Sequence, residues 1–504
     1  MNIADWIRKW SLLTPRHIAL IDENTPITYN ELNTRINRLS NFLLKIGLKK
    51  EDRVSVLLNN SHEFLEVFFA VSKIGAVFVP LNLRLSAPEI EYVINDCSAE
   101  TLFLDPQFSE IILSLQGSLP ILKGHFICTG QEFPHFAKPY EKIFEESPSH
   151  EPVLTQKTSM DSPHMIMYTS GTTGLAKGAV MSHGKTFFNI LNANIYYNIT
   201  PGDKIIVSRP LFHSGGLLVD TLPFLYKGGT AIIKKRFSPE DLLNSVQKYN
   251  ATVLETSATM FRFILEQCHL EDYDLSGVRC LFTGGERVPI TLLQSFRDRG
   301  ILISQIFGQT EASTITWLPT DLAEQKMGSV GIPVFHGDVK IADREGHEVA
   351  AGESGEILVS GPILMSGYWG RPELTAETIK NGWLHTGDLA RRDEEGFYYI
   401  LDREKNLFIS GGENVYPAEV ERVLLENPRI SSAAVIGVPD PKWGEAGKAF
   451  IVPKKNEEMT REEVISFCVG KMAKFKIPKY VKFIDRLPEN AAGKIMRHLL
   501  KDIE

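Results

Sequence analysis

The first helical pattern in the chain is also its clearest. Thr28 and Glu31 have the spacing of a capping box, in which two side chains satisfy free N–H groups at a helix start. Apolar residues then recur every three or four positions and share one helical face: Leu32, Ile36, Leu39 and Leu43. Gly47 suits the end of a helix, because glycine tolerates the left-handed conformation found there. We therefore predict a helix between Thr28 and Gly47.

Short apolar runs alternate with helical patterns up to about residue 328. The pattern predicts a buried strand at 54–58, a helix at 62–74 and a strand at 76–79. Further runs of strand length follow at 164–169, 204–208, 229–233, 252–256, 279–283 and 302–307. Strands that alternate with helices favour parallel pairing, because the helix carries the chain back across the sheet. The pattern therefore predicts an α/β fold with layered, mostly parallel sheets.

The pattern changes after that point. Short strands and glycine-rich turns dominate 328–402, which indicates a β-rich subdomain at the end of a large domain spanning 1–402. The last stretch, 403–504, has its own apolar set and predicts a small α+β domain. Its predicted elements are a helix in EVERVLLENP, strands in SAAVIGVPD and AFIVP, and a helix at 460–474.

Composition and charge exclude several classes of protein. The chain has 504 residues, of which 43% are hydrophobic and 23% charged, as in a globular protein of more than one domain. The net charge of −8 argues against nucleic acid or an anionic membrane as the main partner. Five scattered cysteines without a CxxC pair argue against a disulfide framework or a zinc site.

Targeting signals are not evident in the sequence. Charged residues interrupt the apolar residues at the N-terminus, which does not resemble a signal peptide. The longest apolar stretch, 67–81, contains Lys73, Gly75 and Pro80 and is too short to span a bilayer. The final residues, KDIE, are not a peroxisomal address. We expect a cytoplasmic protein without a transmembrane segment.

The stretch YTSGTTGLAKG, residues 168–178, is the strongest chemical signal. It follows an apolar run and combines hydroxyls, glycines and one lysine, so its N–H groups and hydroxyls could face phosphate oxygens. It is not a Walker loop, because Lys177 is followed by Gly178 and the glycines have a different spacing. A flexible glycine- and threonine-rich turn is the alternative reading of this stretch.

Four further stretches occur in order after this loop: IFGQTE (306–311), WLHTGD (383–388), DREK (402–405) leading into GGEN (411–414), and PENAAGK (488–494). With the loop, these motifs resemble those of the adenylate-forming superfamily from about Leu13 to Arg497. That superfamily includes acyl-CoA synthetases, peptide-synthetase adenylation domains and beetle luciferases. Each motif alone is moderately specific, and five in order identify the superfamily.

The resemblance implies a nucleotide site. The loop would hold the phosphates of ATP through Thr169, Ser170, Gly171, Thr172, Thr173, Gly174 and Lys177. Thr169 and Glu311 would reach the Mg²⁺ that bridges the phosphates, a task that suits a hard cation with few protein ligands. Glu311 could instead cap the helix expected near it.

Adenosine would be held by later motifs. Phe307 stands where the superfamily usually has a tyrosine against adenine, and Gly308 and Thr310 follow it. Asp388 would accept from the ribose hydroxyls, and Arg403 would contact ribose or phosphate. A loop cap is the alternative role for Asp388, and a surface ion pair is the alternative for Arg403.

The resemblance also implies a mobile C-terminal domain with a hinge near Lys405. In one pose this domain would bring Lys494 to the α-phosphate and the attacking carboxylate. In the other it would line a channel for coenzyme A, with Gly411, Gly412 and Glu413 near the thiol path. Lys405 could instead be an ordinary exposed linker residue, and Lys494 a solvated one.

The acyl pocket would use His213, Gly285, Glu286 and the residues around Phe307. His213 would lie near the carboxylate and the thiol channel, although a core or surface histidine is the plain alternative. Glu286 and Arg287 either contact a polar substrate group or form surface pairs, and we favour surface pairs. No aspartate for a substrate ammonium occurs between His213 and Val219, and Leu217 stands where some long-chain enzymes have a gating tryptophan.

These observations favour a ligase, an AMP-forming acyl-CoA synthetase that uses ATP, Mg²⁺ and coenzyme A. The acid would be medium-chain or aromatic. A ligase that loads a carrier protein in trans is the main alternative. Light-emitting chemistry and a nucleotide-binding regulator without catalysis are further readings, and Glu311, Asp388, Arg403 and Lys494 argue against the regulator. Homodimers are common in the superfamily, so a homodimer is one open expectation.

Overall fold

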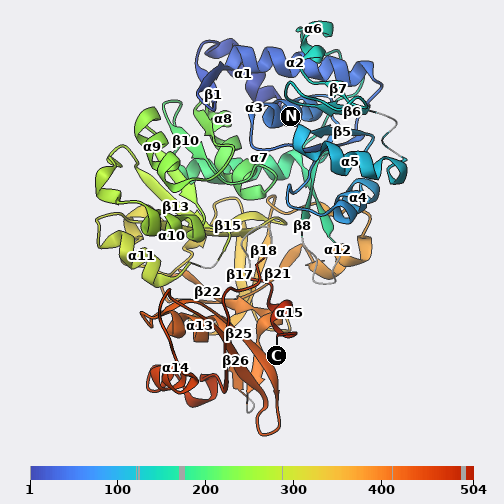
Figure 1. Cartoon of the computed structure of the whole chain (residues 1–504). Helices are drawn as coiled ribbons and strands as arrows, with labels where there is room; N and C mark the ends of the chain where they lie inside the picture. Colours follow the sequence, from blue (N-terminus) through green and yellow to red (C-terminus); the bar gives the residue numbers. More distant parts are fainter. Residues whose placement is uncertain are drawn as a thin grey trace.

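The computed structural model describes residues 2–120, 122, 125–169, 176–286, 288–410, 413–489 and 495–503. Figure 1 shows a large lobe built from most of the chain and a smaller lobe at the C-terminal end, which contains the helices α13 (Pro417–Leu425) and α14 (Arg461–Cys468).

Two large sheets organise the first lobe. Among the described residues, a nine-stranded sheet has the order β16, β15, β14, β13, β12, β10, β11, β1, β2 and an eight-stranded sheet the order β19, β9, β8, β4, β3, β5, β6, β7. The strands of the first sheet are β16 (Ile332–Pro333), β15 (Ser313–Trp317), β14 (Ser304–Gln309), β13 (Cys280–Gly284), β12 (Val253–Thr256), β10 (Lys204–Val207), β11 (Thr230–Ile233), β1 (Ile18–Asp22) and β2 (Thr25–Thr28). The strands of the second are β19 (Gly367–Tyr368), β9 (Lys177–Ser182), β8 (Pro163–Thr169), β4 (Val77–Pro80), β3 (Arg53–Leu57), β5 (Thr101–Leu104), β6 (His125–Cys128) and β7 (Lys138–Pro139).

The pairing inside each sheet is parallel, and antiparallel pairs lie toward the edges. Strand β10 pairs in parallel with β11 and β12, and β3 pairs in parallel with β4 and β5. The pairs β14–β15 and β8–β9 are antiparallel. The predicted fold class, α/β with layered and mostly parallel sheets, is confirmed.

Helices cover these sheets, with bounds α1 Asp5–Leu13, α2 Tyr29–Lys45, α3 His62–Lys73, α4 Ala87–Asp96, α5 Ser109–Leu115, α6 Lys142–Glu146, α7 His183–Tyr197, α8 Leu222–Lys227, α9 Pro239–Tyr249, α10 Ala258–Gln267, α11 Ile290–Arg297 and α12 Pro372–Thr378. Helix α2 begins with the predicted capping box, in which the Thr28 N–H donates to Glu31 Oε2 at 2.8 Å. The four apolar positions predicted for its inner face are buried.

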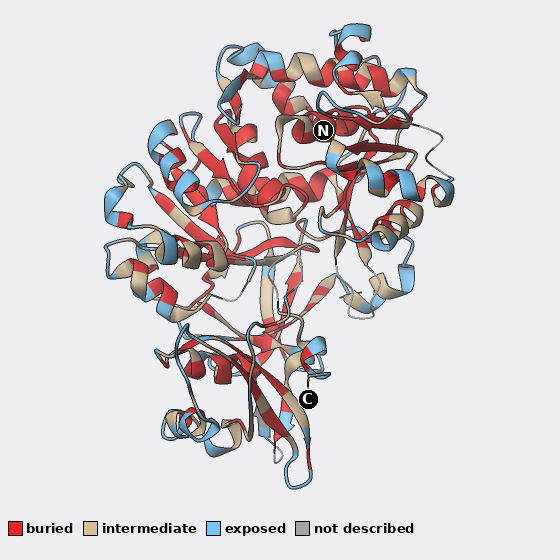
Figure 2. Cartoon of the chain, in the orientation of Figure 1, coloured by how far each residue is buried: buried red, intermediate tan, exposed pale blue. Residues whose placement is uncertain are grey.

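The long apolar stretch at 67–81 is core. Helix α3 is buried from Phe64 to Lys73, and β4 follows it into the middle of the eight-stranded sheet. Figure 2 shows the buried residues concentrated on the strands and on the helix faces that turn toward them. In the part of the chain that the structure describes, no helix combines the length and apolar character needed to cross a bilayer.

A third, antiparallel sheet follows the two large ones. It contains β17 (Asp338–Ala342), β18 (Ser354–Ser360), β20 (Ile379–Lys380), β21 (Trp383–Arg392) and β22 (Tyr398–Arg403). Strand β21 lies between β18 and β22, so residues near its centre have neighbours on both sides.

The C-terminal lobe has a sheet of its own, formed by β23 (Phe408–Ser410), β24 (Glu413–Val415), β25 (Ile430–Asp440), β26 (Gly444–Pro453) and β27 (Tyr480–Phe483), and the chain ends after α15 (Arg497–Leu500). The prediction of a helix over 460–474 is wrong in length. Helix α14 ends at Cys468 because Val469 is extended and Gly470 has a φ of +80°. A left-handed glycine of this kind ends a helix.

Candidate functional site

The site begins where the two large sheets come together. Thr169 ends β8 and pairs in register with Lys177, the first residue of β9, in the eight-stranded sheet. Glu311 lies in the turn between β14 and β15, in the nine-stranded sheet. Lys177 Nζ is 3.9 Å from Glu311 Oε1, so a cation and a carboxylate from different sheets face each other.

A tyrosine lies between these two charges. The Tyr368 hydroxyl donates to Glu311 Oε1 at 2.7 Å and accepts from Lys177 Nζ at 2.5 Å. Glu311 and Tyr368 are buried and Lys177 is half-buried. Partial burial lowers the pKa of Lys177, although the nearby Glu311 opposes this effect. An anionic ligand such as a phosphate stabilises the charged form of a partly desolvated lysine.

Phe307 and Gly308 lie near the end of strand β14, and Thr310 lies in the turn that follows. The Phe307 ring is half-buried against the core below the antiparallel sheet. Gly308 has no room for a side chain, because a Cβ there would lie 2.0 Å from the carbonyl oxygen of Ser313. The requirement for glycine therefore comes from the close approach of β14 and β15.

Asp388 and Arg403 form a second charged pair. They lie opposite each other in the β21–β22 register, and Arg403 Nε is 2.5 Å from Asp388 Oδ1. Asp388 is only 4% exposed. Arg403 also contributes to lowering the pKa of Lys177, so this pair lies within electrostatic range of the first one.

Lys405 follows Arg403 in a short 3₁₀ turn, Glu404–Asn406. Burial of part of its side chain and the repulsion of Arg403 lower the pKa of Lys405, while Asp388 opposes the change. Glu413 begins β24 and is exposed. Within the described ranges, no hydrogen bond or ion pair joins Glu413 to the charged pairs.

His213 lies just before a π-helical turn, Gly215–Thr221. Burial lowers the pKa of His213 to about 4, and Arg209 and Arg84 act in the same direction, so the imidazole is neutral near pH 7. In the described part of the chain its Nε2 has no hydrogen-bond partner although it is buried. A neutral, half-buried imidazole with an open nitrogen suits contact with a ligand.

Gly285 and Glu286 follow strand β13. Gly285 is exposed and has a φ of +83°, which favours glycine. The Glu286 carboxylate accepts from the N–H and the hydroxyl of Thr259, at 2.6 and 3.0 Å, at the start of α10. Glu286 therefore stabilises the N-terminus of α10. Its carboxylate pairs with a neighbouring residue, which is the alternative that the sequence favoured over contact with the substrate.

Several predicted site residues lie outside the described residues: Ser170, Gly171, Thr172, Thr173, Gly174, Arg287, Gly411, Gly412 and Lys494. Their predicted roles stay predictions.

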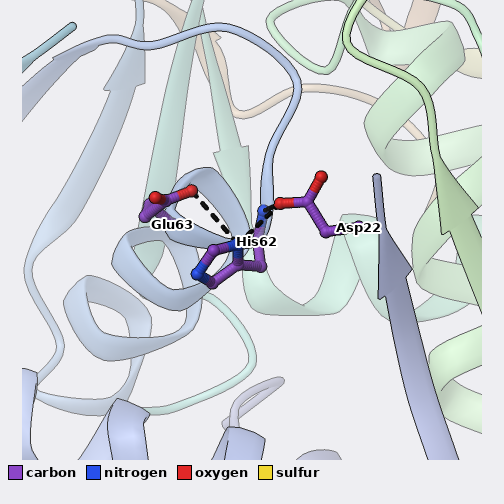
Figure 3. A group of neighbouring side chains, drawn as sticks. All are labelled: Asp22, His62 and Glu63. Carbon is purple, nitrogen blue, oxygen red and sulfur yellow. Dashed lines mark hydrogen bonds and ion pairs between the residues drawn. The ribbon is translucent and has the colours of Figure 1, made fainter. Parts of the chain in front are cut away.

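A further group of possible metal ligands, Asp22, His62 and Glu63, was not expected from the sequence (Figure 3). His62 Nδ1 lies 2.6 Å from Asp22 Oδ2 and 3.3 Å from Glu63 Oε2. Burial opposes protonation, but the hydrogen bond to Asp22 and the nearby carboxylates raise the pKa of His62 to about 9. The contact between His62 and Asp22 joins the end of β1 to the start of α3.

Comparison with known proteins decides the family. The model of the AMP-binding enzyme family matches residues 7–369, and that of the AMP-binding enzyme C-terminal domain matches residues 419–494. The chain belongs to the AMP-binding enzyme family. The superfamily resemblance of the sequence motifs is thereby confirmed.

Individual members of this family match the chain over nearly its whole length. It is 38% identical to a feruloyl-CoA synthase of Amycolatopsis, with 98% of each chain covered. It is 34% identical to a 2-succinylbenzoate–CoA ligase of Bacillus cereus, covering 100% of this chain and 99% of the relative.

Solved structures of AMP-binding enzymes show the same fold. The o-succinylbenzoate CoA synthetase of Bacillus subtilis, in complex with its acyl-adenylate intermediate, has a TM-score of 0.88 at 34% identity, with 99% and 98% of the two chains covered. The ATP-bound MatB of Rhodopseudomonas palustris has a TM-score of 0.92 at 30% identity, with 100% and 99% covered.

Sequence reasoning missed two residues of this AMP-binding enzyme. Tyr368 was not singled out, because its partners Lys177 and Glu311 lie far away in the sequence. Lys185, in the first turn of α7, is 1% exposed and donates to the Ser313 hydroxyl two residues after Glu311. Nothing in its local sequence, between Gly184 and Thr186, marks this lysine.

Proposed function

We propose that the chain is an AMP-forming acyl-CoA synthetase that activates an aromatic carboxylic acid. The observation that carries the proposal is the facing pair Lys177 and Glu311 beside the pair Asp388 and Arg403. This arrangement offers a cation for phosphate, a carboxylate for a metal and a carboxylate for ribose within one site. The 38% identity to a feruloyl-CoA synthase supports the thioester product and an aromatic acid.

The residues present fit a magnesium ion. The Thr169 hydroxyl and the Glu311 carboxylate are hard oxygen ligands, which Mg²⁺ prefers, and two protein ligands leave positions for phosphate oxygens and water. When bound there, Mg²⁺ would neutralise phosphate charge. Lys177 adds a positive charge on the same side.

The nucleotide would extend from this point toward β21 and β22. We propose that the Phe307 ring packs against adenine and that Asp388 accepts from the ribose hydroxyls, with Gly308 and Thr310 lining the same edge. Arg403, already 2.5 Å from Asp388, would hold that carboxylate in place and contact ribose or phosphate.

Two half-reactions follow in this proposal. A carboxylate oxygen of the acid attacks the α-phosphorus of ATP, and pyrophosphate leaves as the acyl-adenylate forms. The sulfur of coenzyme A then attacks the acyl carbonyl carbon, the thiol proton is lost, and AMP leaves. Lys494 would stabilise the charge that builds in the first step.

The division into 1–402 and 403–504 with a hinge at Lys405 is part of the proposal. The 3₁₀ turn around Lys405 supports it, because Glu404 and Lys405 are exposed and a change of backbone angles there would move no buried side chain of these two residues. Gly411, Gly412 and Glu413 would then approach the thiol path.

The acid would lie near His213 and the segment around Gly285 and Glu286. The neutral, half-buried His213 favours an uncharged acyl group beside it. We therefore propose an aromatic acid, with a medium-chain fatty acid as the second choice.

The test is an assay of AMP and pyrophosphate release over aromatic and medium-chain acids, with and without coenzyme A, beside Lys494→Ala. The proposal expects AMP only when an acid and coenzyme A are both present, and loss of adenylation in the variant. Pyrophosphate release without any acyl-CoA would favour the alternative, a ligase that loads a carrier protein. No pyrophosphate with any acid would overturn the proposal.

A further inference from the structure

Tyr368 links the two sheets that provide the proposed magnesium–ATP site. Its short strand β19 pairs with β9 of the eight-stranded sheet, with Tyr368 opposite Ala179. The chain just before it reaches the nine-stranded sheet, where the Met365 N–H donates to the Glu311 carbonyl at 2.7 Å. The backbone therefore fixes the tyrosine against both sheets.

The hydroxyl of Tyr368 uses both of its hydrogen-bonding functions between opposite charges. It donates its proton to Glu311 Oε1 at 2.7 Å and accepts from Lys177 Nζ at 2.5 Å. Lys177 also lies over the tyrosine ring, 4.0 Å from the centroid. Tyr368 is 5% exposed, so water competes little for these contacts.

The spacing of the two charges is the informative feature. An ammonium and a carboxylate in direct contact are separated by about 2.8 Å. Here Lys177 Nζ and Glu311 Oε1 are 3.9 Å apart, and the phenol oxygen contacts both. A directly closed pair would have to be broken before phosphate and metal could bind, at a cost in affinity.

We infer that Tyr368 is a positioning residue that keeps Lys177 and Glu311 from closing into an ion pair before ATP binds. The inference rests on the proposed function, because it takes magnesium–ATP as the ligand of these two residues. Tyr368 acts through them and need not touch the nucleotide.

The test uses Tyr368→Phe, which keeps the ring and the cation–π contact and removes the hydroxyl. In a crystal structure of the ligand-free variant, we expect the distance between Lys177 Nζ and Glu311 Oε1 to fall from 3.9 Å to about 2.8 Å. We also expect calorimetry to show about tenfold weaker binding of magnesium–ATP. The kcat at saturating ATP should stay within about threefold.

Tyr398→Phe is the matched control. Tyr398 is 1% exposed, and its hydroxyl donates to the Val339 carbonyl at 2.9 Å. We expect this variant to bind magnesium–ATP like the wild type. If both variants lose magnesium–ATP affinity and melting temperature to the same extent, the loss follows from removing any buried tyrosine hydroxyl. This result would overturn the inference.

An unchanged 3.9 Å separation with unchanged ATP binding in Tyr368→Phe would also overturn the inference. Neither readout requires turnover of an acid. If no acid supports pyrophosphate release by the wild type while the variant still binds ATP more weakly, the ligase proposal fails and the role of Tyr368 stands.

Discussion

Arg403 and Asp388 face each other across the neighbouring strands β22 and β21, with Arg403 Nε 2.5 Å from Asp388 Oδ1. Arg403 is the last residue of β22, and the proposed hinge residue Lys405 follows two positions later. The pair therefore anchors the end of the third sheet next to the proposed joint. A movement of the C-terminal lobe would begin beside the residues that we propose to hold ribose.

The first prediction concerns Asp388. Asp388→Asn keeps the size of the side chain but removes the charge that binds Arg403 and the acceptor proposed for ribose. We expect ATP to bind at least about tenfold more weakly, since hydrogen bonds to charged groups contribute about 1.5–3 kcal/mol. Binding is measured by calorimetry, with Glu404→Gln, an exposed neighbour, as the control. Equal affinity in Asp388→Asn and the wild type would argue that Asp388 only caps the loop.

The second prediction concerns a buried ionic cluster below the His213 segment. Arg209 Nη2 lies 2.5 Å from both Asp220 Oδ1 and Glu255 Oε1, and both carboxylate side chains are fully buried. Burial raises the pKa of Asp220 to about 6, against the attraction of Arg209, and raises the pKa of Glu255 as well. Removal of the cation would leave two buried carboxyl groups without compensation.

We therefore expect Arg209→Met to destabilise the fold by about 3 kcal/mol. The loss should grow as the pH rises from 5.5 to 8, because the carboxyl groups then lose their protons in an apolar environment. Melting temperatures of the wild type, Arg209→Met and the triple variant Arg209→Met, Asp220→Leu, Glu255→Leu test this. The triple variant should regain most of the loss, and a triple variant as unstable as the single one would refute the explanation.

The third prediction concerns the ion pair between His62 and Asp22. The pKa of His62 is about 9 in the fold, above its ordinary value of 6.5, so the folded state holds the proton more tightly. The pair stabilises fully below pH 6.5, and its contribution disappears as the pH rises through 9. At pH 6 we expect the contribution to be of the order of 3 kcal/mol, since one pKa unit corresponds to about 1.4 kcal/mol.

His62→Gln should therefore melt below the wild type at pH 6, and the two curves should converge near pH 10. His347→Gln is the control, because His347 is 80% exposed beside Asp343. A difference between His62→Gln and the wild type that stays constant from pH 6 to 10 would show that packing, and not charge, explains it.

Local signals predicted much of the fold. The capping box of α2 and the alternation of apolar runs with helices are properties of short segments, and the structure matches them. The predicted helix at 460–474 failed because the left-handed Gly470 and the extended Val469 outweigh the apolar spacing. An apolar spacing is judged over many residues, so one or two residues with non-helical backbone angles change it little.

The site was predictable where a motif marks it and not elsewhere. Lys177, Glu311, Asp388 and Arg403 were all named from motifs, and the structure pairs them two by two. Tyr368 was missed because its role depends on two partners in different sheets. Contacts that form only when separate sheets meet leave no local signal in the sequence.

The central claim is that the acid is activated through an acyl-adenylate. The direct test is to supply the acid with ¹⁸O in its carboxylate, together with ATP, Mg²⁺ and coenzyme A, and to analyse the products by mass spectrometry. The claim predicts one ¹⁸O in the phosphate of AMP, because a carboxylate oxygen bonds to the α-phosphorus and leaves with AMP when the thiol attacks. The appearance of ADP with ¹⁸O in inorganic phosphate, or of unlabelled AMP beside acyl-CoA, would contradict it.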